Sequence, residues 1–152
     1  MTQLVNQFEI GKEKGQLDLA KNWNSISVRA SEALVAGQKV KIVDNSYGIP
    51  EVVACDDTTV AFGFMNYSLK NSSIASGKIG ELSMDGNVMY MIAGAAISAY
   101  ADVMYVAATG KVITAAGTTT KWIDGFAIDK ATADGDLIRV SITCNRKQRP
   151  TA

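Results

Sequence analysis

The chain has 152 residues, the size of one ordinary domain, and 47% of them are hydrophobic, which is enough to build a core without disulfides. Its 15 Lys and Arg balance its 15 Asp and Glu, which argues against nucleic acid or an anionic membrane as a partner, because both attract a basic excess. Histidine is absent, so the commonest general base and metal ligand are missing, and we expect no enzyme, no metal and no cofactor.

Residues 1–24 are more polar than the rest of the chain, and we expect them to form an extended N-terminal arm. The apolar side chains of this arm have too few apolar neighbours to form a core, so we expect them to pack against another surface. An ordinary first hairpin of the domain is the alternative. The residues concerned are Leu4, Val5, Phe8 and Ile10.

No segment predicts export or membrane insertion. The N-terminus lacks the basic and apolar regions of a signal peptide, and no apolar run approaches the roughly 18 residues of a membrane span. Cys55 and Cys144 fit neither a zinc spacing nor a disulfide framework. These features predict a soluble protein made in a reducing cytoplasm.

From Ser25 onward, apolar residues recur with a period of two, which is typical of half-buried strands. Val40 and Ile42, for example, alternate with Lys39 and Lys41, which we expect on the wet face. We predict strands at Ile26–Arg29, around Val40 and Ile42, and at Val52–Ala54, Val60–Met65, Ile79–Ser83, Val88–Ile92, Val103–Val106, Val112–Thr114, Ile123–Ile128 and Leu137–Thr143.

Glycine-containing turns separate these strands. Asp85-Gly86 is the strongest signal for a tight hairpin, and Thr109-Gly110, Asp124-Gly125 and Asp134-Gly135 add others. Helical signals are weak and short, at 31–36, 67–74 and 95–100. Residues 25–144 are therefore predicted to form an all-β domain, an antiparallel β-sandwich or a barrel-like fold with little helix.

The glycines also predict that this domain contains two related halves. Gly48 and Gly63 are 15 residues apart, as are Gly110 and Gly125, and the second pair lies 62 residues after the first. Each pair is followed by a polar stretch, another glycine and a new strand. We predict approximate repeats at about 33–84 and 95–143 that pack together into one domain. Chance spacing of glycines is the alternative.

The region from Ala93 to Ile142 carries the most specific pattern. A hairpin bends at Thr109-Gly110-Lys111-Val112, an Ala/Thr/Gly loop leads to Ile123-Asp124-Gly125-Phe126-Ala127, and Leu137-Ile138-Arg139-Val140 closes the domain. This order resembles the capsid cement, or head decoration, proteins of tailed bacteriophages, over roughly Ala33 to Thr143.

The resemblance implies a structural virion protein, made in the bacterial host cytoplasm. It implies a homotrimer that binds the major capsid protein on the capsid exterior and stabilises the shell without chemistry. We expect capsid binding at Leu4, Val5, Phe8, Ile10 and Trp23. Met89, Tyr90 and Met91 are the candidates for a subunit interface, although core filling is favoured for them. The basic tail, residues 145–152, could bind an acidic patch, although a solvated terminus is more common.

The aromatic side chains leave a second hypothesis open, a binding module. A carbohydrate- or protein-binding β-module of a phage fibre or baseplate would need exposed aromatic residues, for which Trp23, Trp122 and Tyr100 near Asp102 are available. A trimeric nucleotidohydrolase of the dUTPase kind lacks its substrate motifs here. The acidic pairs Asp56-Asp57 and Asp134 with Asp136 sit at turn signals, where we expect solvated turn residues rather than a metal site.

Overall fold

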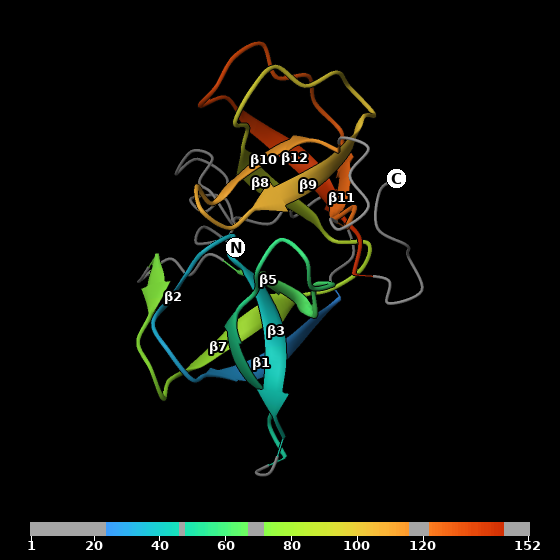
Figure 1. The fold of residues 1–152 in the computed structure, drawn as a ribbon. Coiled ribbons are helices and arrows are strands. Elements are labelled where there is room, and N and C mark those ends of the chain that lie inside the picture. Colours follow the sequence, from blue (N-terminus) through green and yellow to red (C-terminus); the bar gives the residue numbers. More distant parts are fainter. Residues whose placement is uncertain (1–23, 46–47, 67–71, 116–121, 145–152) are drawn as a thin grey trace, which may run out of the picture.

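The computed structural model describes residues 24–45, 48–66, 72–115 and 122–144. Within these residues the chain forms twelve strands and no helix, so the all-β prediction is confirmed. The strands form two groups, one from each half of the sequence, which lie one above the other (Figure 1).

The first group is a closed barrel, with strand order β1-β4-β3-β5-β7. Its pairs are antiparallel except β1 with β4, and β7 closes the barrel by pairing with β1. A short ladder of β2 and β6 lies beside it. The bounds are β1 (Ser25–Ala30), β2 (Leu34–Val35), β3 (Lys39–Asp44), β4 (Glu51–Ala54), β5 (Gly63–Met65), β6 (Ser73–Ile74) and β7 (Ile79–Ser83).

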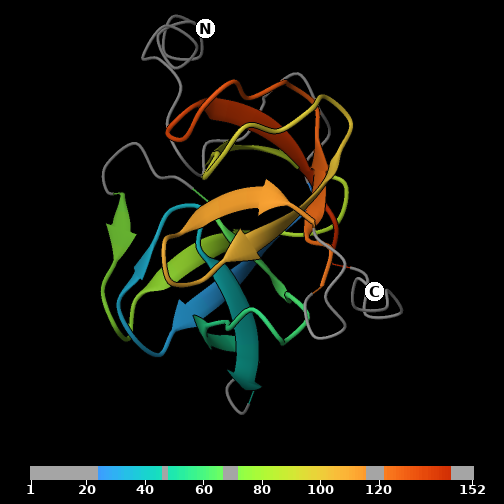
Figure 2. The ribbon, with the colours of Figure 1, turned by 45° about the horizontal axis from the view of Figure 1, so that its top comes forward.

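The second group is a five-stranded sheet with order β10-β9-β11-β12-β8. Its strands are β8 (Val88–Ile92), β9 (Asp102–Val106), β10 (Lys111–Thr114), β11 (Gly125–Ala127) and β12 (Leu137–Ile142). The outer strands β8 and β10 approach each other through a parallel bridge between Ala93 and Val112. Figure 2 shows this sheet and the barrel from a second direction.

Strand order is the same in both groups when β8 is matched to β1 and β12 to β7. Backbone hydrogen bonds match as well. The Gly37 N–H donates to the Met65 carbonyl at 2.7 Å, and the Tyr100 N–H donates to the Ala127 carbonyl at 2.7 Å, 63 and 62 positions later in the chain. These contacts support the two related halves, whose origin as sequence repeats stays a prediction.

The paired glycines of the sequence occupy matching places in the two groups. Gly48 and Gly110 both have a positive φ, of 76° and 67°, in the β3–β4 and β9–β10 connections. Gly63 and Gly125 both begin a strand in close contact with a neighbouring backbone, where an added Cβ would overlap the carbonyl oxygens of Ser83 and Ser141. The spacing therefore reflects two backbone requirements that only glycine meets without strain.

Two buried cores hold the fold together. One fills the barrel and includes Val28, Leu34 and Leu82. The other lies mainly in the second half but takes in Phe64 of β5. The Phe64 ring meets the Tyr105 ring edge to face, with centroids 5.9 Å apart, so the two halves share a core rather than merely touching.

Every strand expected from the period of two is present, but the helical predictions at 31–36 and 95–100 are wrong, and most of 67–74 lies outside the described residues. Residues 31–36 contain β2, the described end of 67–74 is β6, and in 95–100 Ile97 pairs with Ala131 through two backbone hydrogen bonds. Segments this short cannot nucleate a stable helix alone, and their backbone groups find partners across the fold instead.

Asp85-Gly86 is also not the tight hairpin turn that the sequence predicts. Gly86 has a positive φ of 88°, but Asp85 does not, and the flanking strands β7 and β8 do not pair with each other. Both edges of β7 are already used, by β1 and β5, so β8 pairs with β12. The chain crosses here from the barrel to the second sheet (Figure 1).

Replacing Gly125 with Ala tests the close approach of β11 to β12. We expect Gly125→Ala to lower the free energy of unfolding by at least about 1–3 kcal/mol, because the new methyl group meets backbone that cannot move aside. Gly94→Ala is the control, since its nearest neighbour is an Ile113 methyl at 3.1 Å on a side chain that can shift. Equal losses in urea unfolding of the two variants would contradict this account.

Candidate interaction surface and the junction of the two halves

A buried ion pair joins the barrel to the second half. Lys39 of β3 is fully buried and Asp124, just before β11, is 3% exposed, with Lys39 Nζ 3.1 Å from Asp124 Oδ1. The other carboxylate oxygen, Oδ2, accepts a hydrogen bond from the Tyr105 backbone N–H at 2.8 Å. Burying each ion costs several kcal/mol. The attraction between the two charges and the hydrogen bond from Tyr105 offset part of that cost.

The burial of Lys39 corrects the expectation that it lies on the wet face of its strand. Lys39 and Val40 are both buried, whereas Ile42 further along β3 is exposed. Burial falls steadily along β3 instead of alternating, because the start of the strand lies against the second half, where Lys39 meets Asp124.

Hydrogen bonds surround the ion pair at the junction. The Trp122 indole N–H donates to the Thr58 carbonyl at 2.9 Å, and the Ala107 N–H donates to Asp57 Oδ1 at 2.7 Å. Trp122 is half-buried with its indole N–H satisfied. Asn87, which is 1% exposed, bonds to Asn24 and Ser83 beside the crossing point.

Burial controls the acidity of the groups around this junction. It raises the pKa of Asp124, against the lowering effect of Lys39, and raises the pKa of Tyr105 to about 12. Burial also raises the pKa of Cys55 to about 11 and that of Cys144 further still, so neither thiol is a ready nucleophile.

The acidic turn residues act on nearby backbone groups. Asp56 Oδ1 accepts hydrogen bonds from the Thr58 N–H and hydroxyl, both at 2.9 Å, and from the Thr59 N–H at 2.8 Å. Asp136 Oδ2 does the same for Thr132 and Ala133. The hydrogen bonds to Thr58 and Thr59 lower the pKa of Asp56 to about 2. Both are turn residues, as the sequence predicts.

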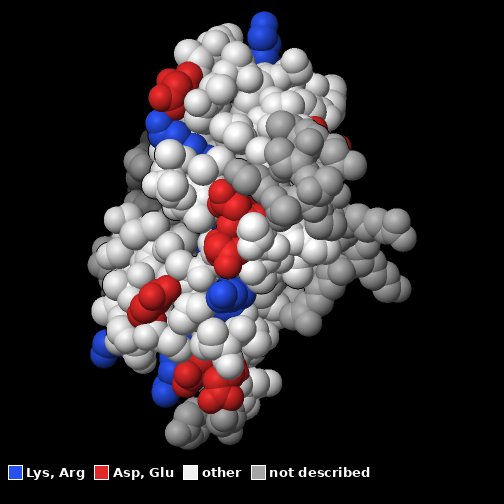
Figure 3. Space-filling view, in the orientation of Figure 1, with Lys and Arg blue, Asp and Glu red and all other residues white. Residues whose placement is uncertain are grey.

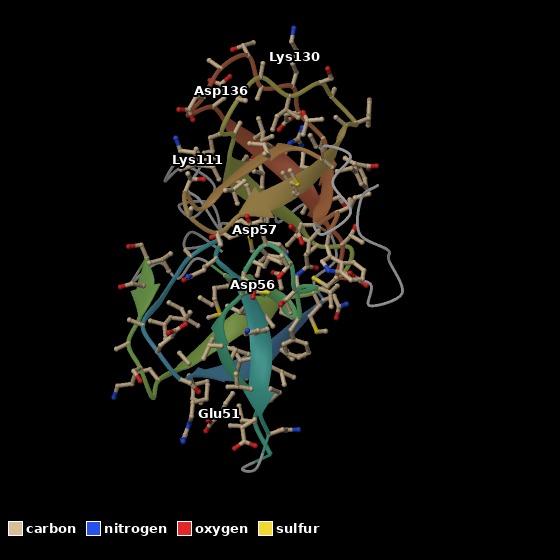
Figure 4. The ribbon with its side chains drawn as sticks, viewed as in Figure 1. Glu51, Asp56, Asp57, Lys111, Lys130 and Asp136 are labelled. Carbon is tan, nitrogen blue, oxygen red and sulfur yellow. The ribbon has the colours of Figure 1, made fainter. Side chains whose placement is uncertain are left out.

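Metal ligands do not gather in the described parts of the chain, where no three Cys, Asp or Glu side chains could together hold an ion. None of the described elements is a helix long and apolar enough to cross a membrane. Acidic and basic side chains are mixed on the face shown in Figure 3, with acidic groups near the level of the junction, where Figure 4 labels Asp56 and Asp57.

Tyr100 is the most unusual exposed residue of the described chain. It is 79% exposed and has a φ of 64°, the one positive φ among the described non-glycine residues. Its counterpart in the first half is Gly37, with a φ of 76° and the matching hydrogen bond. A tyrosine in the left-handed region is strained, and such strain is concentrated at functional sites.

Phe126 lies close to Tyr100 in the fold. It sits in the centre of β11 opposite Asp102 of β9, and the residue after it, Ala127, accepts the Tyr100 hydrogen bond. Phe126 is 38% exposed, whereas its counterpart Phe64 is fully buried. We call Tyr100 and Phe126 together the aromatic surface.

A second set of exposed apolar side chains lies on the first half. Ile42, Val43 and Ile49 flank the tip of the β3–β4 hairpin, and Val35 and Ile79 are elsewhere on the barrel side. The equivalent β9–β10 hairpin carries Ala108 and Thr109 at its tip instead. Exposed apolar residues scattered over a surface are ordinary, so this set alone indicates no site.

The binding residues predicted on the arm, Leu4, Val5, Phe8, Ile10 and Trp23, lie outside the described residues, as does the basic tail. Met89 and Met91 are 0% and 2% exposed, inside the core of the second half. Met89 and Met91 therefore fill the core, which is the role favoured for them over an interface. Tyr90 is half-buried opposite Arg139, and its interface role stays a prediction.

The aromatic surface could be found only in part from the sequence. Tyr100 near Asp102 is among the aromatics considered for a binding module, but nothing in the sequence alone gives its backbone conformation. Phe126 reads as one more strand residue in the Gly-Phe pattern of both halves. Its exposure follows from the open outer face of β11, which the sequence does not reveal.

Comparisons with known proteins give two matches. The family model described as structural cement protein (E217 gp24/Pam3 gp6) matches residues 6–143. Among solved structures, the chain is similar to "The crystal structure of head fiber gp8.5 N base in bacteriophage phi29", with a TM-score of 0.56 and 17% identity, over 82% of this chain and 97% of that one. At this identity the likeness concerns the fold. A search of curated proteins finds no match.

Acid titration tests the role of Asp56. Its pKa lies below the ordinary 3.8, so its contribution to stability is present above pH 3.8 and is lost as the pH falls through about 2. We expect Asp56→Asn, which keeps an acceptor oxygen but cannot ionise, to show a shallower loss of melting temperature between about pH 4 and pH 2. Identical acid slopes for the variant and the wild type would contradict this role.

Proposed function

Because the chain belongs to the family of structural phage cement proteins, we propose that it binds the outer surface of a tailed-phage capsid and stabilises the shell. The observation that carries the proposal is the family match, which extends over residues 6–143 and so includes both halves. The protein acts by binding alone and catalyses no reaction.

Stabilisation by such a protein is a matter of mass action. A protein that binds the assembled shell but not its separate subunits lowers the free energy of the shell, by an amount that grows with its free concentration relative to its Kd. Selectivity for the mature shell follows if the binding site forms only when capsid subunits rearrange. The major capsid protein is then the direct partner.

The aromatic surface is our candidate for the contact with the capsid. Tyr100 holds a backbone conformation that its counterpart Gly37 adopts without strain, so selection for the side chain is a direct reason to keep it. Tyrosine and phenylalanine bury large areas at interfaces and lose little conformational freedom when they do so. An anchor here would leave the buried junction undisturbed.

The arm and a trimeric state extend the same proposal. Three linked copies binding together hold a surface far more tightly than one, because after the first contact the others are intramolecular. The apolar residues Leu4, Val5, Phe8 and Ile10 of the arm supply additional binding area for each copy.

A second candidate is an attachment module of a phage fibre. The similarity in fold to the base of a phage head fibre favours it, because the same fold there belongs to a protein of the phage head. In both candidates the protein binds a phage particle. As a cement protein it stabilises the shell, whereas as a fibre module it attaches a fibre.

Tyr100→Gly separates binding from folding. The glycine removes the strain, and we expect the free energy of unfolding to rise by up to about 1 kcal/mol. Loss of the aromatic anchor should weaken binding to expanded heads at least about tenfold. Co-sedimentation of purified protein with expanded and unexpanded heads measures the binding, and thermal unfolding measures the stability.

Val43→Ser is the matched control, because Val43 is an exposed apolar side chain, 51% exposed, on the β3–β4 hairpin. It should leave binding unchanged. Loss of binding with Val43→Ser but not with Tyr100→Gly would move the contact to that hairpin. Absence of binding by the wild-type protein to either form of head would remove the cement function.

Deletion of Met1 to Lys21 tests the arm. We expect weaker binding to expanded heads with an unchanged melting temperature, since the apolar residues of this segment have too few apolar neighbours in the sequence to form a core. A Leu4, Val5, Phe8 and Ile10 to Ser variant of the full-length chain should behave like the deletion. Unchanged affinity in both would overturn the role of the arm.

A further inference from the structure

The Lys39 ammonium is buried in an unusual way. It lies 3.1 Å from Asp124 Oδ1, off the direction of a hydrogen bond, and it makes no hydrogen bond within the described parts of the chain. An ammonium group has three N–H donors, and burying it without hydrogen bonds to the protein is expensive. A simple buried ion pair accounts poorly for this arrangement.

The site does not follow from the relation between the two halves. By the pairing of the strands, Lys39 corresponds to Asp102 and Asp124 corresponds to Phe62. Lys39 and Asp124 therefore occur together only at the junction, where β3 of the barrel meets the start of β11. The contact between Lys39 and Asp124 is therefore specific to the junction and has no equivalent within either half.

We propose that Lys39 and Asp124 are joined by an isopeptide bond between Nζ and Cγ, formed by the folded protein itself. The structure holds the two groups side by side, with Nζ 3.1 Å from Asp124 Oδ1, the oxygen bonded to the carbon that Nζ attacks. The link is a covalent tie between the two halves and does not depend on the proposed function.

The reaction is a condensation and needs no other reactant. The Lys39 ammonium passes a proton to Asp124 Oδ1, which gives a neutral amine and a neutral acid, and burial favours this neutral pair. The amine attacks Cγ, the bond from Cγ to Oδ1 breaks, and Oδ1 leaves as water with the transferred proton and a second amine proton. The product is a secondary amide with one N–H.

The surroundings of Asp124 suit this step. Oδ2, which becomes the carbonyl oxygen of the amide, already accepts the Tyr105 N–H at 2.8 Å, and that donor stabilises the negative charge that develops on Oδ2 during attack. Burial raises the pKa of Asp124, which favours the acid form. The Phe64 and Tyr105 rings and the shared core keep out water that would reverse the reaction.

Mass spectrometry of the full-length protein under denaturing conditions tests the proposal. We expect the mass to be lower than that of the sequence by one water molecule. Tryptic digestion should release a branched peptide that joins the fragments carrying Lys39 and Asp124. Lys39→Arg and Asp124→Ala remove a reacting group, so each should retain the full sequence mass.

The pair Lys111 and Asp134 is the internal control. Lys111 Nζ lies 2.7 Å from Asp134 Oδ1, closer than the buried pair, but both side chains reach the solvent. Figure 4 labels Lys111 on the second half. Proximity alone predicts a branched peptide at this pair too, whereas burial predicts one only at Lys39 and Asp124.

A wild-type protein of full sequence mass, with no peptide joining Lys39 to Asp124, would overturn the proposal. That result needs no variant, so it stands even if Lys39→Arg or Asp124→Ala fails to fold. A branched peptide at Lys111 and Asp134 as well would overturn the argument from burial.

Discussion

The contact between Lys39 and Asp124 is the constraint around which the two halves are arranged. With its partner removed, either group would be a buried charge without compensation, so the packed halves are held in the one arrangement that brings the two groups together. The contact fixes where β3 lies against the start of β11, and the Phe64 and Tyr105 rings pack at the same junction. Asp124 also accepts the Tyr105 N–H, so this one carboxylate ties a strand of the barrel to two parts of the second sheet. Non-directional apolar packing could not give that precision of placement.

Much of the architecture could be predicted from the sequence because it rests on local rules. The period of two located the strands, and the glycines at 48, 63, 110 and 125 marked the positions where a side chain would be strained or would overlap backbone. The strands β2 and β6 were missed because each is two residues long and pairs with a distant partner, which leaves no periodic signal. Lys39 was placed on the wet face because a lysine in an alternating strand is usually solvated, and only the tertiary contact with Asp124 reverses that. The exposure of Phe126 likewise depends on the uncovered face of the central strand β11, which neighbouring residues in the sequence do not reveal.

The two halves share one strand order but differ in the residues that they expose. In the first half, Gly37 adopts its positive φ without strain, and Phe64 is buried in the shared core. In the second half, Tyr100 and Phe126 occupy the matching places but face solvent, and the fold bears the cost of the Tyr100 conformation. A duplicated arrangement permits this division, because one half can preserve the core while the other diverges at its surface.

Because each half is contiguous in the chain, the first half can fold before the second is made. All strands of the barrel are complete in the sequence by Ser83, before the first strand of the second sheet begins at Val88. The barrel can therefore close while the ribosome is still making the rest, as domains commonly do during synthesis. Phe64, however, finds its ring partner Tyr105 only later. The newly made barrel leaves the Phe64 ring uncovered in the interval, and the speed of translation through the second half sets how long the unfinished protein is prone to aggregate.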